Sequence, residues 1–156
     1  MLNVINGLQS EPILESNYEK YEEQNGTSLQ ISFSSFNFDK NIGHELIDFN
    51  VTIEDEDGHQ YKVKQLTEQN DTKSVVANHI FFELIGFTKQ EVIQGFHNFT
   101  YYANFLFQGS GWTYENVDIL ETANFNTFGG DNFLQLIQRL IAGFDCEFQI
   151  LPNRVI

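Results

Sequence analysis

An Asp-Gly pair with alternating apolar residues on both sides constrains the fold of this chain more than any other feature of its sequence. Before the pair, Asp57-Gly58, every second residue from 47 to 53 is apolar, and after it the alternation resumes at Tyr61 and Val63. A period of two is typical of a strand with one buried face, and two such runs around Asp-Gly predict a β-hairpin. The first half of the chain is therefore expected to be built on β-structure.

The register of this hairpin follows from the requirement that both apolar faces lie on the same side of the sheet. A two-residue loop would place Ile53 opposite Lys62. A three-residue loop, 56–58, instead pairs Ile53 with Tyr61, and a slip of one residue would turn every side chain to the other face. We expect the three-residue loop, with Gly58 in the left-handed conformation that glycine adopts without strain.

Other segments of the first half extend this pattern. Apolar and polar residues alternate over 29–34, which predicts a strand, and a further strand is expected over about 73–78. The apolar run 80–85 predicts a short helical turn that ends at Gly86. The character of the chain changes there, although no Pro- or Ser-rich linker marks a boundary.

The second half has a mixed pattern of helices and strands. Apolar residues at helical spacing predict a helix over about 99–106 that stops at Gly109, followed by a strand near 113–119. Asp131 is expected to cap a second, amphipathic helix, and the alternation over 144–151 predicts a closing strand. The apolar face of the second helix comprises Phe133, Leu136, Ile137, Leu140 and Ile141. The fold class expected for the whole chain is α+β.

The chain is strongly acidic, since 22 Asp and Glu against 8 Lys and Arg give a formal net charge of −14. Such a surface repels phosphate backbones and anionic membranes, which argues against specific nucleic-acid binding and membrane association. No apolar run approaches the roughly 20 residues that span a bilayer, and the first residues lack a signal-peptide pattern. The acidic residues gather in two runs, which we interpret as solvated loops. These runs are Glu11, Glu15, Glu19, Glu22 and Glu23, and then Glu54, Asp55, Glu56 and Asp57.

The His and Cys residues form no pattern of a catalytic or metal site, so no catalytic residue, cofactor or metal is expected. The histidines are scattered, without an H-x-x-x-H spacing. His79 lies at the junction of a predicted strand and helical turn, and is expected to hydrogen-bond that corner. Cys146, the single cysteine, lies among alternating apolar residues and is expected to be a small core residue, not a nucleophile.

The segment Gly109-Ser110-Gly111-Trp112 is the sharpest local motif. Two glycines allow the chain to leave a helix and turn the indole into place. A single Trp is more often a core anchor than a platform for a sugar ring, so Trp112 is expected in the core.

Taken in order, several motifs resemble those of the phage minor structural proteins also called prophage tail endopeptidases or tail-associated lysins. The motifs are an acidic hairpin over 53–63, the junction 77–84, the Gly-Ser-Gly-Trp segment 109–112 that ends a helix, and a closing acidic–aromatic segment, 146–148. No single motif is specific, but the ordered set spans roughly residues 25 to 156.

This resemblance implies a baseplate-hub-like protein at the tail tip of a siphophage. It implies a β-barrel-like tube domain over 1–86 and an incomplete, inserted α+β domain over 87–156. It also implies a homotrimer that closes the tail tube, contacts the distal tail protein and the tape measure protein, and lets viral DNA pass without specific binding. Part of the acidic surface, such as Glu54, Asp55, Glu56 and Asp57, would then face the lumen.

The resemblance further implies that any peptidoglycan-cleaving activity lies in C-terminal extensions, and that this chain is a fragment of a longer protein. Two other classes of function stay open. A carbohydrate-binding module is favoured by the aromatic content of 15% and the acidic surface. A peptidoglycan hydrolase is favoured only by the name of the family.

Overall fold

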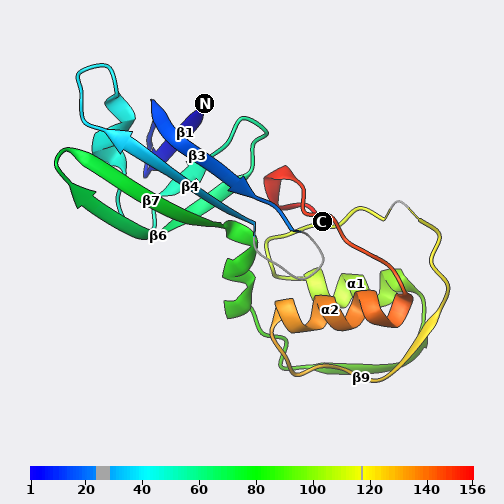
Figure 1. Ribbon diagram of the computed structural model, residues 1–156. Coiled ribbons are helices and arrows are strands. Elements are labelled where there is room, and N and C mark those ends of the chain that lie inside the picture. Colours follow the sequence, from blue (N-terminus) through cyan, green and yellow to red (C-terminus); the bar gives the residue numbers. More distant parts are fainter. Residues whose placement is uncertain (24–28, 117) are drawn as a thin grey trace. The chain divides into compact units, whose positions relative to one another are not determined.

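The structure, a computed structural model, describes residues 1–23, 29–116 and 118–156. These residues form two compact units, Met1–Ile80 and Phe81–Ile156 (Figure 1). The sequence places the boundary near Gly86, six residues later. The reason for the difference is the 3-10 helix η2 (Ile80–Gly86), which packs with the second unit because its Phe81 ring lies edge-on to Trp112 at 5.8 Å.

The first unit is a single antiparallel sheet of seven strands. The strands are β1 (Leu2–Asn6), β2 (Gln9–Ile13), β3 (Glu15–Tyr21), β4 (Gln30–Phe36), β5 (Thr52–Glu54), β6 (Gln60–Gln69) and β7 (Thr72–His79). Their order across the sheet is β2-β1-β5-β6-β7-β4-β3, and among the described residues the two edge strands pair with no further strand. The sheet is thus curled into a half-barrel, where the resemblance implies a β-barrel-like domain.

The core of this unit lies on one face of the sheet, because alternate residues of neighbouring strands point to the same side. In β4 and β7 every second residue is buried, as the alternation in the sequence predicts. Residues without any exposed surface come from six different strands: Val4, Ile13, Ile31, Ile53, Val63 and Ala77 among them. A bulge in β6 between Val63 and Gln65 interrupts the ladder and bends the strand.

The hairpin of β5 and β6 has the predicted register. Ile53 pairs with Tyr61, and the N–H of Asp55 donates to the carbonyl of His59, which leaves a three-residue loop between them. Gly58 has a φ of 85°, in the left-handed region. The register and the three-residue loop predicted from the matching apolar faces are therefore confirmed.

Changing Gly58 to valine should destabilise the first unit by about 1–3 kcal/mol, because a β-branched residue at positive φ is strained. Asparagine tolerates the left-handed region, so Gly58→Asn should lose clearly less. Urea unfolding of both variants measures the difference. Equal stability of Gly58→Val and the unchanged protein would contradict the turn geometry.

The strand expected to begin at Ile47 starts only at Thr52, so the first half of that prediction is wrong. The 3-10 helix η1 (Ile42–Leu46) precedes it, and Asn50 has a φ of 61°, which breaks an extended chain. Apolar residues still alternate in the sequence there, because Ile47 and Val51 lie in a loop and their side chains are buried in the core.

The second unit combines two helices with a two-stranded antiparallel sheet (Figure 1). Its elements are β8 (Val92–His97), α1 (Phe99–Phe107), β9 (Ala123–Gly129), α2 (Phe133–Phe144) and the 3-10 helix η3 (Pro152–Arg154). Both helices appear where the sequence predicts them, and α1 is capped by the Asn98 side chain. Together the two units confirm an α+β fold.

The sequence analysis expects Asp131 to cap helix α2, but the capping residue is Asn132. The side chain of Asn132 accepts from the N–H of Gln135, whose side chain accepts from the N–H of Asn132, a capping box. Asp131 instead forms an ion pair with Arg139 at 3.0 Å. Both residues can cap a helix, and the reciprocal bond from Gln135 favours Asn132.

In the described residues of 113–119, which exclude 117, and in 144–151, the expected strands do not form. The described chain there makes isolated bridges, Thr113 with Val155 and Leu151 with Val155. The sheet of this unit is built from β8 and β9, which the sequence analysis missed because Gly95 and several Asn residues weaken their alternation.

Candidate functional site

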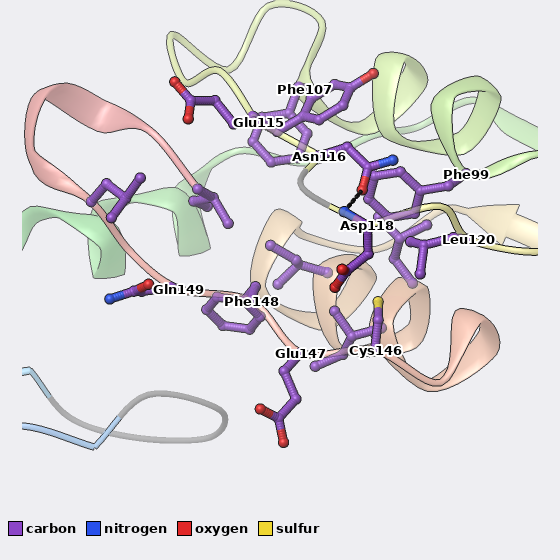
Figure 2. A pocket seen from close by; sticks show the side chains of 16 residues that line it. Phe99, Phe107, Glu115, Asn116, Asp118, Leu120, Cys146, Glu147, Phe148 and Gln149 are labelled. Atoms are coloured by element: carbon purple, nitrogen blue, oxygen red, sulfur yellow. Dashed lines mark hydrogen bonds between the residues drawn. The ribbon is translucent and has the colours of Figure 1, made fainter.

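The second unit contains a cavity of about 260 Å³ beside its two helices (Figure 2). Helix α1 contributes Phe99 and Phe107 to the lining, and helix α2 contributes Ile137 and Leu140. These positions recur at helical spacing, so one face of each helix lines the cavity. Ile156 closes part of the wall. The interior is therefore predominantly apolar.

Polar groups lie at the margin of this cavity. Asp118 and Cys146 lie near one another in Figure 2, whereas Glu115 and Glu147 lie at opposite sides. The N–H of Asp118 donates to the side-chain oxygen of Asn116 at 3.3 Å. The cavity thus combines an apolar floor with an acidic margin.

Cys146 is half-buried and lines this cavity, so it is not the fully enclosed core residue that the sequence analysis expects. The position follows from the end of α2, where Asp145 takes a left-handed conformation and the N–H of Cys146 bonds to the carbonyl of Ile141. Burial, together with the charges of Asp145 and Asp118, raises the pKa of the thiol. The thiol stays protonated at neutral pH and is a weak nucleophile.

The first unit holds a buried carboxylate at the acidic hairpin. Asp55 accepts hydrogen bonds from the N–H groups of Asp57 and His59 and from the hydroxyl of Tyr61, and it lies 3.0 Å from the ammonium of Lys20. Burial alone would raise the pKa of Asp55, but the bonds from Lys20 and His59 outweigh it and the pKa lies below its ordinary value. The interpretation of a solvated loop is wrong for Asp55, because a partner distant in sequence neutralises it.

His79 belongs to the same network. Its Nε2 lies 3.1 Å from Nδ1 of His59, and its ring packs edge-on to Tyr61. The side chain therefore bonds to the neighbouring hairpin, whereas the sequence analysis expects a hydrogen bond to the strand-to-helix corner. Burial and the neighbouring His59 lower the pKa of His79 to about 4.

This lowered pKa predicts a loss of stability in mild acid. His79 titrates near 6.5 when unfolded and near 4 when folded, so between these values the unfolded state binds the additional proton. Neutral His79 contributes about 3 kcal/mol to the free energy of unfolding. This contribution is fully present above pH 6.5 and is lost as the pH falls towards 4. His79→Gln should flatten the dependence of unfolding free energy on pH over this interval. An unchanged pH profile in the variant would contradict the assignment.

Trp112 lies in the core of the second unit, as predicted, with 5% of its surface exposed. Gly109 and Gly111 have φ values of 81° and 78°, which only glycine adopts freely. Between them the hydroxyl of Ser110 accepts from the N–H of Trp112. The loop thereby turns the indole inward.

The residues singled out from the sequence do not converge on one site. Asp55, Gly58 and His79 lie in the first unit, whereas Trp112 and Asp131 lie in the second. Within residues 1–23, 29–116 and 118–156, no group of three or more His, Cys, Asp or Glu could hold a metal ion. No described helix is long and apolar enough to cross a membrane. The apolar cavity was not predicted, because segments distant in sequence form it.

No family model and no curated protein matches the chain. A solved structure does match it: prophage tail protein gp18 from Listeria monocytogenes EGD-e aligns with a TM-score of 0.79 and 20% sequence identity. The chain has the fold of a prophage tail protein. The match covers 99% of this chain and 48% of the solved one, so this chain spans about half the length of that protein.

Proposed function

We propose that this chain is a structural part of a phage tail, located in the virion at the tail tip as part of the hub. The observation that carries the proposal is the match with gp18, which extends over both units and 99% of the chain. Independent support comes from the ordered motifs of the acidic hairpin, the junction 77–84 and the Gly-Ser-Gly-Trp segment. Two different comparisons, one of sequence motifs and one of fold, thus favour the same class of protein.

In this proposal three copies of the full-length protein surround the tail channel. They would close the tube, sit on the distal tail protein and contact the tape measure protein. The curled sheet with two edges free of further described strands supports such an arrangement, because exposed edge strands present N–H and carbonyl groups to a neighbouring subunit.

Isolation of tails that contain the full-length protein tests this proposal. Antibody labelling should mark the tail tip, and a cryo-EM reconstruction should show three copies around the channel. Labelling along the tail shaft, or a ring with another number of copies, would contradict the hub assignment. Absence of the protein from purified particles would contradict the tail assignment as a whole.

We further propose that acidic side chains line the channel, because a basic wall would hold DNA phosphates through counterion release. Glu54, Glu56 and Asp57 remain candidates at the hairpin, since Glu56 and Asp57 are 80% and 66% exposed. The run from Glu11 to Glu23 is the other candidate. Asp55 is excluded by its burial. Lysine at lumen-facing positions should leave assembly intact and slow DNA ejection in a fluorescence assay, whereas unchanged ejection would contradict the idea.

The chain is also expected to hydrolyse no cell-wall polymer. The pKa of the Cys146 thiol is raised, and the pKa of the His79 imidazole is lowered. Both residues are held by structural contacts. Incubation with purified peptidoglycan should therefore release no muropeptides. Release that disappears in a His79→Ala variant would contradict this prediction and favour a hydrolase.

Carbohydrate binding is the second candidate, and one surface favours it. An open groove of the second unit is lined by aromatic and amide side chains, the combination that binds sugar rings and hydroxyls. These lining side chains include Tyr101, Asn104, Phe105, Gln108 and Tyr114. Glycan-array binding that is lost in Tyr101→Ala would support this function. If no glycan on the array were bound, the structural role would be favoured over carbohydrate binding.

A further inference from the structure

The cavity beside α1 and α2 has more open apolar surface than a closed core would leave. Ile141, Leu120 and Leu151 line it and are only half-buried, whereas Ile137 and Leu140 beneath them are 2% and 1% exposed. A well-packed interior leaves few voids larger than a water molecule. A volume of about 260 Å³ is therefore large for a packing defect. It is also below the range of about 300–1,000 Å³ that is usual for small-molecule sites.

The charges at the margin of the cavity have one sign. Glu115, Asp118 and Glu147 are exposed, and the lining contains neither Lys nor Arg. Among the described residues none of these three carboxylates takes part in an ion pair. The acidic margin is thus electrostatically complementary to a cationic ligand, while the floor is complementary to an apolar group.

We propose that this cavity binds a basic segment of a partner protein. One apolar side chain of that segment would enter between Phe99 and Leu140, and flanking Lys or Arg side chains would contact the three marginal carboxylates. The volume suits a single large side chain, and a buried apolar anchor with a charged rim is the usual anatomy of a small protein interface. The inference rests on the cavity alone, so its failure would leave the proposed tail function untouched.

Short peptides added to the full chain test this inference, and Cys146 is the internal reporter. The probes are blocked peptides of the sequences Lys-Lys-Phe-Lys-Lys, Lys-Lys-Ser-Lys-Lys and Glu-Glu-Phe-Glu-Glu. Because the net charge of −14 attracts any cation, the serine peptide measures non-specific binding. The basic Phe peptide should shift the amide NMR signals of residues 146–149 and slow alkylation of Cys146 by N-ethylmaleimide. It should bind at least tenfold more tightly than either control peptide.

Variants separate the margin from the general charge. Changing Glu115 and Glu147 to Gln should weaken binding by about two- to fivefold each, the range of exposed ion pairs. Glu121→Gln removes an exposed carboxylate that does not line the cavity, and should change nothing. These residues are exposed, so the fold should persist in every variant.

Protein alkylated at Cys146 provides a second test, in which the added group blocks the cavity. Prior reaction of Cys146 with N-ethylmaleimide fills part of the cavity and should abolish binding of the Phe peptide, with an unchanged circular dichroism spectrum. Equal binding to alkylated and free protein would overturn the proposal. So would a control peptide, acidic or serine, that binds as tightly as the basic Phe peptide, or the absence of any shift at residues 146–149 up to millimolar peptide.

Discussion

Replacing Asp55 with alanine is expected to lower the free energy of unfolding of the first unit by about 2–4 kcal/mol, because donors around this buried carboxylate lose their acceptor. The variant leaves the hydroxyl of Tyr61 and the N–H of His59 without this acceptor. The ammonium of Lys20 loses one of its three carboxylate partners and keeps Glu22 and Asp57. A buried donor without a partner costs its full desolvation energy. Denaturant unfolding at neutral pH measures the loss.

Asp57 provides the matched control for this experiment. It lies two positions along the same acidic run, and its carboxylate is 3.3 Å from the same ammonium of Lys20, but it is 66% exposed. An exposed ion pair contributes about 0–1 kcal/mol. Asp57→Ala should therefore be nearly neutral. If the two variants lost similar amounts of unfolding free energy, the burial of Asp55 would not be the cause of its larger expected effect.

The contrast between these two residues shows which part of the structure the sequence could predict. The register of the hairpin was predictable, because the apolar faces on both sides of the turn restrict it to Ile53 opposite Tyr61. The burial of Asp55 was not. Its cationic partner, Lys20, lies on β3, and nothing in the run 54–57 indicates that one carboxylate of the four turns inward.

The same distinction explains the errors in secondary structure. Helix α2 was predictable from its apolar face, whereas the choice between Asp131 and Asn132 as cap depended on one reciprocal bond with Gln135. Strand β2 was missed because Pro12 within it is unfavourable in most strands, and is tolerated at the edge of the sheet. Edge position depends on the fold and has no local signal.

The candidate cavity lies beyond local patterns altogether. Its walls come from α1, α2 and the segments around Tyr114 and Phe148, which no period of two or of 3.6 relates to one another. The only hint in the sequence was Cys146 among acidic and aromatic residues. That residue was expected to be enclosed, because alternation there predicted a strand that the chain does not form.

Replacing Trp112 with alanine is expected to destabilise the second unit by about 3–5 kcal/mol, the usual range for a buried Trp. The indole is 5% exposed and its ring lies 5.8 Å from Phe81 in an edge-on arrangement. Removal of so large a side chain leaves a cavity that the neighbouring rings fill only in part. Thermal unfolding followed by near-ultraviolet circular dichroism should show a lower midpoint for this unit.

Two comparisons distinguish a core anchor from a sugar platform at this position. Trp112→Phe keeps an aromatic ring in the core and should lose clearly less stability than Trp112→Ala, whereas Phe96→Ala removes a side chain that is 69% exposed and should be nearly neutral. If Trp112→Ala kept full stability but lost glycan binding, the indole would be a ligand platform and the carbohydrate-binding function would gain over the structural one. The large loss is expected instead, because Gly109 and Gly111 adopt left-handed conformations in the loop that holds the indole inside the unit.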